Sequence, residues 1–325
     1  MGVFCGHLNA TESPGSCAVL LPDMGKISVV TTTRNSEKTI DRCLRSVSWS
    51  DEIIVVDSSS NDRTREIVKK YTTAVYTKEN NPMLNVNKNY GFDKATGDWI
   101  LSLDSDEEIP PELGVEIRSC IADRGPAVSY WIPRKNIIFG KWIRHGLWWP
   151  DKQLRLFRKG FGKFPCLHVH EYLEVDGPMQ DLTHPYIHHN YDSISQFLNK
   201  MDPIYTESQV QKLQDTNYQL AWHDAVRFPV SDFVKIYFAQ EGYRDGLHGL
   251  VLAILQAFSS FVVFAKLWER QGFADHEIPL AAVKSELGQQ KRIMDYWLLS
   301  VRIKQTRSVL MKIWLKIWRR YAATA

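Results

Sequence analysis

Paired cysteines are what this sequence of 325 residues most clearly lacks. Its five cysteines are odd in number, widely spaced and contain no Cys-x-x-Cys pair, which argues against a disulfide framework and a cysteine-based zinc site. The first 24 residues also lack the basic segment followed by an apolar stretch that a secretory signal needs. We therefore expect a cytoplasmic protein and interpret residues 1–25 as a flexible leader.

An excess of charge of either sign is absent too. The chain has 40 lysine and arginine residues against 37 aspartate and glutamate residues, a net charge of +3, so its charge gives no indication of a nucleic-acid partner. Hydrophobic residues make up 44% of the chain, an ordinary share for a globular protein. A chain of this length can hold one large α/β domain and an appendage.

Short apolar runs alternate with helical periodicity from residue 26 to residue 110. Apolar, β-branched runs predict buried strands at residues 27–33, 52–57, 74–77 and 98–104. Helical spacing between them is carried by Ile40, Cys43, Leu44 and Val47 and by residues 62–71 and 83–95. Strands separated by single helices predict an α/β fold whose mainly parallel sheet has helices on both faces.

The composition of the chain changes after this first part. Residues 111–192 are rich in aromatics and histidines, with short apolar runs broken by Gly and Pro. This pattern predicts an antiparallel extension that carries the acceptor and catalytic region. With residues 26–110 it forms the predicted catalytic domain, residues 26–192. The pattern is helical over residues 193–325, which predicts a membrane-associating or oligomerising appendage.

Histidines are concentrated in the predicted extension. They stand at positions 168, 170, 184, 188 and 189, close to Cys166. Histidine and cysteine are the usual ligands of zinc, but this spacing fits no structural zinc pattern. We interpret these side chains as the polar and aromatic lining of an acceptor groove.

Polar side chains directly follow three of the predicted strands. Ligands of an open parallel sheet bind beyond the carboxyl ends of its strands, so these side chains are candidates for binding a nucleotide. They are Thr33 and Asn35, Asp57 and Asp62, and Asp104 and Asp106. Asp57 is suited to accept hydrogen bonds from a base or a ribose.

Asp104 and Asp106 are two residues apart, so their carboxylates point the same way if the chain is extended there. Two convergent carboxylates are suited to Mg²⁺ or Mn²⁺, which prefer oxygen ligands and keep positions free for phosphate. Aspartates at strand ends are also common as helix caps and turn residues. Agreement among three strand ends favours metal binding over that structural interpretation.

Five motifs follow one another in the first part of the chain. They are SVVTTTRN at residues 28–35, IIVVDSSSNDRT at 53–64, NKNYG at 87–91, ATGDWIL at 95–101 and DSDE at 104–107. In order and spacing they resemble the motifs of family 2 glycosyltransferases, which have the GT-A fold. Two later segments, WPDKQLRLFR at 149–158 and VHE at 169–171, resemble the lipopolysaccharide core β-glucosyltransferase subgroup of that family.

The resemblance implies an inverting, metal-dependent enzyme of cell-envelope polysaccharide biosynthesis. Such an enzyme moves a hexose, glucose in this subgroup, from a UDP-sugar to a lipid-linked or lipopolysaccharide-type glycan. Asp104 and Asp106 are the implied ligands of Mg²⁺ or Mn²⁺, and Lys88 is expected close to the phosphates. The implied donor-binding set is Thr33, Asn35, Asp57, Asp62, Lys88, Asp104, Gln153 and Arg155.

Inversion requires one base that takes the proton of the acceptor hydroxyl. Glu171 and Asp151 are both candidates, and Glu171 is favoured because His170 beside it is suited to orient it. Gln153 and Arg155 are suited to hold either the donor phosphates or the acceptor. Their spacing differs from the QxxRW signature of processive synthases, which predicts a single addition.

Two segments of the helical part bear on membrane contact. Residues 247–265 approach the roughly 20 apolar residues that a spanning helix needs, but polar residues interrupt them, so we expect a buried or interfacial helix. The C-terminal helix has Lys312, Lys316, Arg319 and Arg320 on one face and, on the other, Leu310, Ile313, Trp314, Ile317, Trp318 and Tyr321. This pattern predicts contact with the inner face of the plasma membrane, although the same face suits a homo-oligomer.

Two other functions fit parts of the pattern. A nucleotidyltransferase shares the nucleotide-binding half and the metal carboxylates, but it usually has a Gly-rich loop after the first strand, and residues 31–35 contain no glycine. A catalytically inactive relative would keep the sugar-nucleotide pocket as a scaffold. The presence of both Asp104 and Asp106 argues against that inactive relative.

Overall fold

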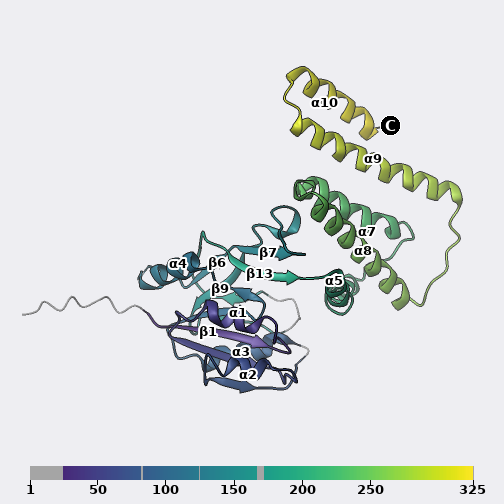
Figure 1. Ribbon diagram of the computed structural model, residues 1–325. Helices are drawn as coiled ribbons and strands as arrows, with labels where there is room; N and C mark the ends of the chain where they lie inside the picture. Colours follow the sequence, from purple (N-terminus) through teal and green to yellow (C-terminus); the bar gives the residue numbers. More distant parts are fainter. Residues whose placement is uncertain (1–24, 82, 124, 167–171, 325) are drawn as a thin grey trace, which may run out of the picture.

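A seven-stranded sheet forms the centre of the protein (Figure 1). The computed structural model describes residues 25–324 except 82, 124 and 167–171, with side chains up to residue 320. The strands lie in the order β12 (Met179–Asp181), β6 (Ser129–Ile132), β9 (Gln153–Arg158), β4 (Trp99–Asp104), β1 (Ile27–Thr33), β2 (Glu52–Asp57) and β3 (Val75–Thr77).

Most neighbours in this sheet run parallel. β4, β1, β2 and β3 are parallel to one another, and β9 is antiparallel to both β4 and β6. The register pairs Thr33 of β1 with Asp57 of β2, and Thr32 of β1 with Asp104 of β4. The carboxyl ends of three strands, with the polar residues that follow them, therefore lie at one edge of the sheet.

Helices cover both faces of the sheet. Val29 packs with Leu113 of α4 (Pro111–Ala122), whereas its neighbour Val30 packs on the opposite face with Phe92 of α3 (Leu84–Lys94). Gly91 lets α3 approach β1, because a Cβ atom there would lie 2.4 Å from a methyl carbon of Val30. Helices α1 (Ile40–Ser46) and α2 (Thr64–Val68) pack against Val55 of β2. The predicted α/β fold with a mainly parallel sheet is confirmed.

A second sheet has the strand order β5 (Glu107–Glu108), β13 (Tyr186–Tyr191), β7 (Arg134–Ile138) and β8 (Lys141–Trp142). β13 pairs antiparallel with β5, and β7 pairs antiparallel with β8. β13 runs parallel to β7, so the predicted antiparallel extension is wrong for this pair of strands. Parallel neighbours need a connection of a dozen or more residues, and residues 139–185 supply one. This connection carries η1 (Gly146–Trp148) and a two-stranded ribbon of β10 (Gly162–Lys163) and β11 (Glu174–Val175).

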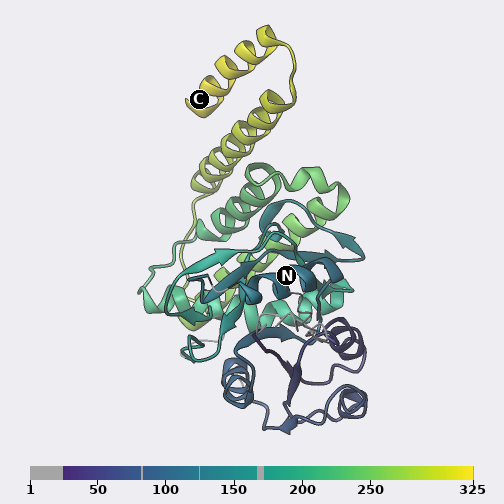
Figure 2. The same ribbon diagram turned by 90° about the vertical axis from the view of Figure 1, so that its left-hand side faces the viewer.

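The chain is helical from Ile194 onward (Figures 1 and 2). Ser193 caps the first of these helices by accepting a hydrogen bond from the Gln196 backbone N–H at 3.1 Å. The helices are α5 (Ile194–Lys200), η2 (Met201–Thr206), α6 (Glu207–Asp215), α7 (Asp224–Phe233), η3 (Val234–Ala239), η4 (Gly242–Asp245), α8 (Leu247–Arg270), α9 (Leu280–Gln305) and α10 (Val309–Thr324). The last two form a hairpin that projects from the rest (Figure 1).

The buried carboxylate of Asp245 ties the helical part to the second sheet. It accepts hydrogen bonds from the backbone N–H groups of Arg144 and His145, at 3.2 and 2.9 Å. Lys141 of β8 donates to the Asp245 carbonyl at 2.7 Å. These bonds fix η4, and with it the start of α8, against the loop that follows β8.

Among the described residues, α8 is the one helix long and apolar enough to cross a membrane. It packs along α7, and Ser260 of α8 donates a hydrogen bond to Asp232 of α7. Its other side is exposed at Leu247, Ile254, Phe258, Phe261 and Trp268. One side of the helix is thus covered by α7, and the choice between a buried, an interfacial and a spanning helix stays a prediction.

Candidate active site

Asp57 lies at the end of β2 with its side chain 0% exposed. Its Oδ2 atom accepts a hydrogen bond from the Ser60 backbone N–H at 3.0 Å, and Arg65 lies 3.8 Å away. Its Oδ1 atom is buried without a hydrogen-bond partner among the described residues, as is the Thr33 hydroxyl. An unpaired buried polar atom is costly, so these two atoms fit a ligand that supplies N–H or O–H donors.

The loops beside Asp57 are held by side chains of the predicted donor-binding set. Asn35 has φ 49° and its side-chain oxygen accepts from the Asn61 N–H at 3.0 Å. Asp62 accepts from the backbone N–H groups of Thr64 and Glu37, at 3.0 and 3.1 Å. Burial raises the pKa of Asp62, but these hydrogen bonds outweigh it and hold the pKa below its usual value. Asn35 and Asp62 thus shape the loops; contact of either with the donor stays a prediction.

A chain of alternating charges lies at the end of β4. Asp104 contacts Lys88 of α3 at 2.7 Å through one oxygen and Arg155 of β9 at 2.7 Å through the other. Arg155 also pairs with Glu107, whose side chain is fully buried. Burial raises the pKa of Asp104, but the two cations outweigh it and hold the pKa far below its usual range. Asp104 is therefore a carboxylate locked between two cations.

Glu107 belongs to this chain of charges, and the prediction from sequence missed it as a site residue. Its second oxygen accepts from the Asp104 backbone N–H at 2.8 Å. Residues 105 and 106 form a turn between β4 and β5, so the expectation of an extended chain from Asp104 to Asp106 is wrong. The turn arises because Glu107 folds back onto Asp104, and it gives the two aspartates different partners.

Asp106 faces His188 of β13, with 3.7 Å between Asp106 Oδ2 and His188 Nε2. The other ring nitrogen of His188 lies 2.8 Å from the Asn136 side-chain oxygen. Asn136 donates through its amide nitrogen to the Trp148 carbonyl and to Asp151, so its oxygen is the acceptor. Nδ1 of His188 therefore carries a proton, and Nε2 faces the carboxylate.

Asp106 and His188 fit a divalent cation. Nε2 of a neutral histidine and a carboxylate oxygen are both metal-ligating atoms. The described residues contain no cluster of three or more His, Cys, Asp or Glu side chains arranged to hold a metal. Mg²⁺ is commonly held by only one or two protein carboxylates together with substrate phosphates and water. The pair is thus suited to a metal whose remaining ligands come from a diphosphate.

Asp151, one of the two predicted bases, is surrounded by donors. Its Oδ2 accepts from Arg134 Nε at 2.7 Å and from Asn136 at 2.9 Å, and Arg134 Nη2 lies 2.6 Å away. Its Oδ1 accepts from Gln153 at 3.1 Å. Asp151 therefore holds Arg134 in place, and Gln153 orients Asp151. Glu171, the other predicted base, lies outside the described residues.

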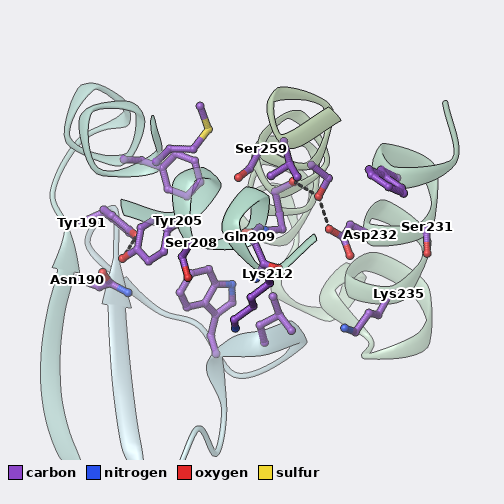
Figure 3. Close-up of a pocket in the computed structure, with 18 of the residues that line it drawn as sticks. Asn190, Tyr191, Tyr205, Ser208, Gln209, Lys212, Ser231, Asp232, Lys235 and Ser259 are labelled. Carbon is purple, nitrogen blue, oxygen red and sulfur yellow. Dashed lines mark hydrogen bonds between the residues drawn. The ribbon is translucent and has the colours of Figure 1, made fainter. Parts of the chain in front are cut away.

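A cavity of about 660 Å³ lies next to the residues that surround Asp106 and Asp151 (Figure 3). His188 and Arg134 line it on the side of the second sheet. Figure 3 shows Asn190 and Tyr191 on one side, Ser208 and Lys212 in the centre and Asp232 and Lys235 on the far side. The helical part of the chain, and not the extension alone, thus builds the space next to the proposed metal ligands.

Comparison with known proteins fits this arrangement. Residues 28–172 match the family model of glycosyl transferase family 2. This part of the chain is similar to the family 2 glycosyltransferases. The matched residues include β1, β2 and β4, whose carboxyl ends carry Asp57, Asp104 and Asp106.

Related proteins are similar over most of the length of this chain. An uncharacterized glycosyltransferase of Rickettsia typhi is 28% identical over 76% of this chain and 88% of its own. The lipopolysaccharide core biosynthesis glycosyltransferase LpsC of Rhizobium meliloti is 23% identical over 73% of this chain and 89% of its own. The chain is therefore similar to glycosyltransferases over most of its length, and residues 28–172 match the family 2 model.

A solved structure of a glycosyltransferase also aligns with this chain. The S. aureus TarS structure of residues 1–349 is 19% identical and covers 76% of this chain and 92% of its own, with a TM-score of 0.40.

Proposed function

We propose that the protein is an inverting hexosyltransferase that uses a UDP-sugar donor, with glucose as the transferred hexose. The observation that carries the proposal is the edge of the sheet where three strands end. There a buried carboxylate oxygen of Asp57 has no hydrogen-bond partner among the described residues, and Asp106 faces His188 across 3.7 Å. The first suits the N–H or O–H donors of a nucleoside, and the second suits a cation that accompanies a diphosphate.

The donor diphosphate is proposed to lie between Asp57 and Asp106, next to Lys88. Lys88 and Arg155 are held by Asp104, so their positive charges are fixed before the donor arrives. Fixed charges stabilise a developing anion without reorganisation during the reaction. A Mg²⁺ or Mn²⁺ ion held by Asp106 and His188 would neutralise charge on the leaving diphosphate. Asp104 then acts by holding the cations, not as a metal ligand.

We propose Glu171 as the base that removes the proton of the acceptor hydroxyl. Asp151 remains the alternative, but its oxygen atoms already accept hydrogen bonds from Arg134, Asn136 and Gln153. With both oxygen atoms in such contacts, the carboxylate is less accessible to an acceptor hydroxyl. Asp151 is thus better placed to orient Arg134 than to accept a proton.

The acceptor is proposed to be a lipid-linked or lipopolysaccharide-type glycan. The similarity to the lipopolysaccharide core biosynthesis glycosyltransferase of Rhizobium meliloti supports this class. A hexose added to such a glycan belongs to cell-envelope polysaccharide biosynthesis, and the donor would be met on the cytoplasmic side of the membrane.

Helix α10 is proposed to place the enzyme on the inner face of the plasma membrane. Leu315 and Arg319 face α9, with Arg319 donating to Ser300 at 3.0 Å. The opposite face is apolar, and Trp314 and Trp318 on it are 54% and 47% exposed. Residues 296–325 contain seven basic and no acidic side chains. An exposed tryptophan face with basic flanks is typical of helices that lie on anionic lipid.

Release of UDP from UDP-hexoses in the presence of Mn²⁺ tests the proposal. We expect UDP-glucose to be turned over when acceptor glycans are supplied, and Glu171→Gln to lower the rate by about a hundredfold or more, the usual contribution of a general base. Asp181→Asn is the control, because Asp181 is exposed and pairs with Lys152. Larger loss in Asp151→Asn than in Glu171→Gln would assign the base to Asp151.

UDP binding without UDP release in any condition would contradict transfer. The protein would then be a sugar-nucleotide-binding scaffold. Turnover that proceeds unchanged in Asp106→Asn would contradict the proposed role of Asp106.

A further inference from the structure

The cavity beside the proposed metal ligands has a positively charged lining. Arg134, Lys212 and Lys235 contribute cationic groups. Asp232 is the one carboxylate among its lining residues, and it accepts a hydrogen bond from Ser260 of α8. The charges that face the cavity therefore favour an anion.

Lys212 and Lys235 differ from other lysines of the helical part. Lys266 pairs with Asp202 and Glu207, and Lys304 pairs with Glu241. No ion pair or hydrogen bond of the Lys212 or Lys235 ammonium group is seen among the described residues. Both are exposed residues that line the cavity (Figure 3). An ammonium group at the wall of a cavity with no protein partner is available for an anion from outside.

The remaining lining suits a saccharide. Asn190, Ser208 and Gln209 supply neutral hydrogen-bonding groups, and Trp148 and Tyr191 supply aromatic rings. Hydroxyl groups of a sugar pair with amide and hydroxyl side chains, and its apolar C–H face packs on aromatic rings. The volume of about 660 Å³ lies within the range of about 300–1,000 Å³ that is usual for small-molecule sites.

We infer that this cavity binds an acceptor saccharide that carries a phosphate or carboxylate group, and that Lys212 and Lys235 recognise that group. The inference rests on the proposed function, because it makes the cavity the acceptor site of the transfer. His188 lies in the wall shared by the cavity and the proposed metal site. An acceptor in the cavity therefore lies beside the donor diphosphate, and the helical part of the chain selects the acceptor.

Binding of three sugars to the full-length protein, loaded with UDP and Mn²⁺, tests the inference. The sugars are glucose 6-phosphate, glucuronic acid and glucose, and titration is followed by calorimetry or by saturation-transfer NMR. We expect at least one of the two anionic sugars to bind about tenfold or more tightly than glucose, as charge-assisted hydrogen bonds are stronger than neutral ones. The sugar that binds more tightly identifies phosphate or carboxylate as the preferred group.

The Lys212→Met and Lys235→Met double variant should lose the preference for the anionic sugar. The Lys212→Arg and Lys235→Arg double variant should keep it, because the charge is retained. Lys291→Met is the matched control on α9, where Lys291 is exposed and pairs with Asp295. Equal binding of all three sugars by the wild type, or an unchanged preference in the methionine variant, would overturn the inference.

A UDP titration of the wild-type protein separates this result from the fate of the proposed function. Absence of UDP binding would count against the donor site itself. UDP binding together with no preference for an anionic sugar would overturn the acceptor inference alone.

Discussion

Arg155 forms ion pairs with two carboxylates, those of Asp104 and Glu107. Its guanidinium group is almost fully buried between Asp104 and Glu107 and lies 5.8 Å from the centre of the Tyr186 ring. Burial lowers the pKa of Arg155, but the two carboxylates outweigh it and raise the pKa well above its usual value. The site thus depends on a buried set of charges in which every member needs its partner.

Arg155→Met should lower the free energy of unfolding by about 3–5 kcal/mol, because it leaves two carboxylates without their shared cation. Chemical denaturation at pH 7 measures the loss. Arg45→Met is the control, since Arg45 forms an exposed pair with Asp41, and such pairs contribute about 0–1 kcal/mol. Equal losses in the two variants would contradict the importance of the buried charges.

Several residues of this edge could be predicted from the sequence, and others could not. Asp57, Asp104 and Asp106 directly follow apolar strands, so their meeting at one edge follows from a parallel sheet. His188 reaches Asp106 only because β13 returns parallel to β7. Glu107 reaches the Asp104 backbone and Arg155 only because residues 105 and 106 form a turn. Neither contact has a signal in local periodicity.

At the scale of elements, the buried strands were the most predictable part. β1, β2 and β4 begin and end within one residue of the predicted ranges, because buried parallel strands are near-continuous apolar runs bounded by polar residues. The direction of β13 relative to β7 was not predictable, because the connection between them, residues 139–185, is long enough to allow either direction. The predicted domain boundaries, after residues 25, 110 and 192, stay predictions.

A bidentate ion pair connects helix α9 to α7. Arg227 of α7 donates to both oxygens of Glu286 at 2.8 and 2.7 Å, and Gln290 donates to Glu286 at 2.7 Å. The Arg227 hydrogen bond, acting against burial, lowers the pKa of Glu286 to about 2. Since the folded pKa is lower than the unfolded one, the pair stabilises the fold above about pH 4.5, and this contribution is lost as pH falls toward 2.

Glu286→Gln should therefore cost about 1 kcal/mol at pH 7, because the charge is lost but one hydrogen bond remains. The difference between variant and wild type should shrink as the pH is lowered from 5 to 3. Hydrogen exchange of α9 amides at each pH measures the difference. A stability difference that stays constant from pH 5 to pH 3 would show that Arg227 does not lower the pKa of Glu286.

At the scale of the whole molecule, the apolar face of α10 lies at the end of the chain farthest from the sheet (Figure 1). The exposed side chains on it are Leu310, Ile313, Trp314, Ile317 and Trp318. The Tyr321 side chain lies outside the described residues. A hairpin that projects in this way can reach a bilayer while the sheet edge stays in water.

Trp314→Ala combined with Trp318→Ala should reduce sedimentation of the protein with phosphatidylglycerol vesicles by about tenfold or more, because both rings leave the interface. Raising the salt concentration should weaken binding of the wild type, since basic side chains contribute through charge. Leu280→Ala is the control, an exposed apolar residue of α9. Unchanged vesicle binding combined with a change from dimer to monomer would show that the face joins two copies instead.

Calorimetric titration with UDP, with and without Mn²⁺, tests the central claim most directly. The account predicts tighter binding with Mn²⁺ in the wild type, loss of that metal-dependent gain in Asp106→Ala and in His188→Ala, and weaker binding with or without metal in Asp57→Asn. Mn²⁺ binding followed by electron paramagnetic resonance gives a second measure that does not depend on activity. UDP binding that ignores Mn²⁺, or that is the same in the wild type and all three variants, would contradict the account.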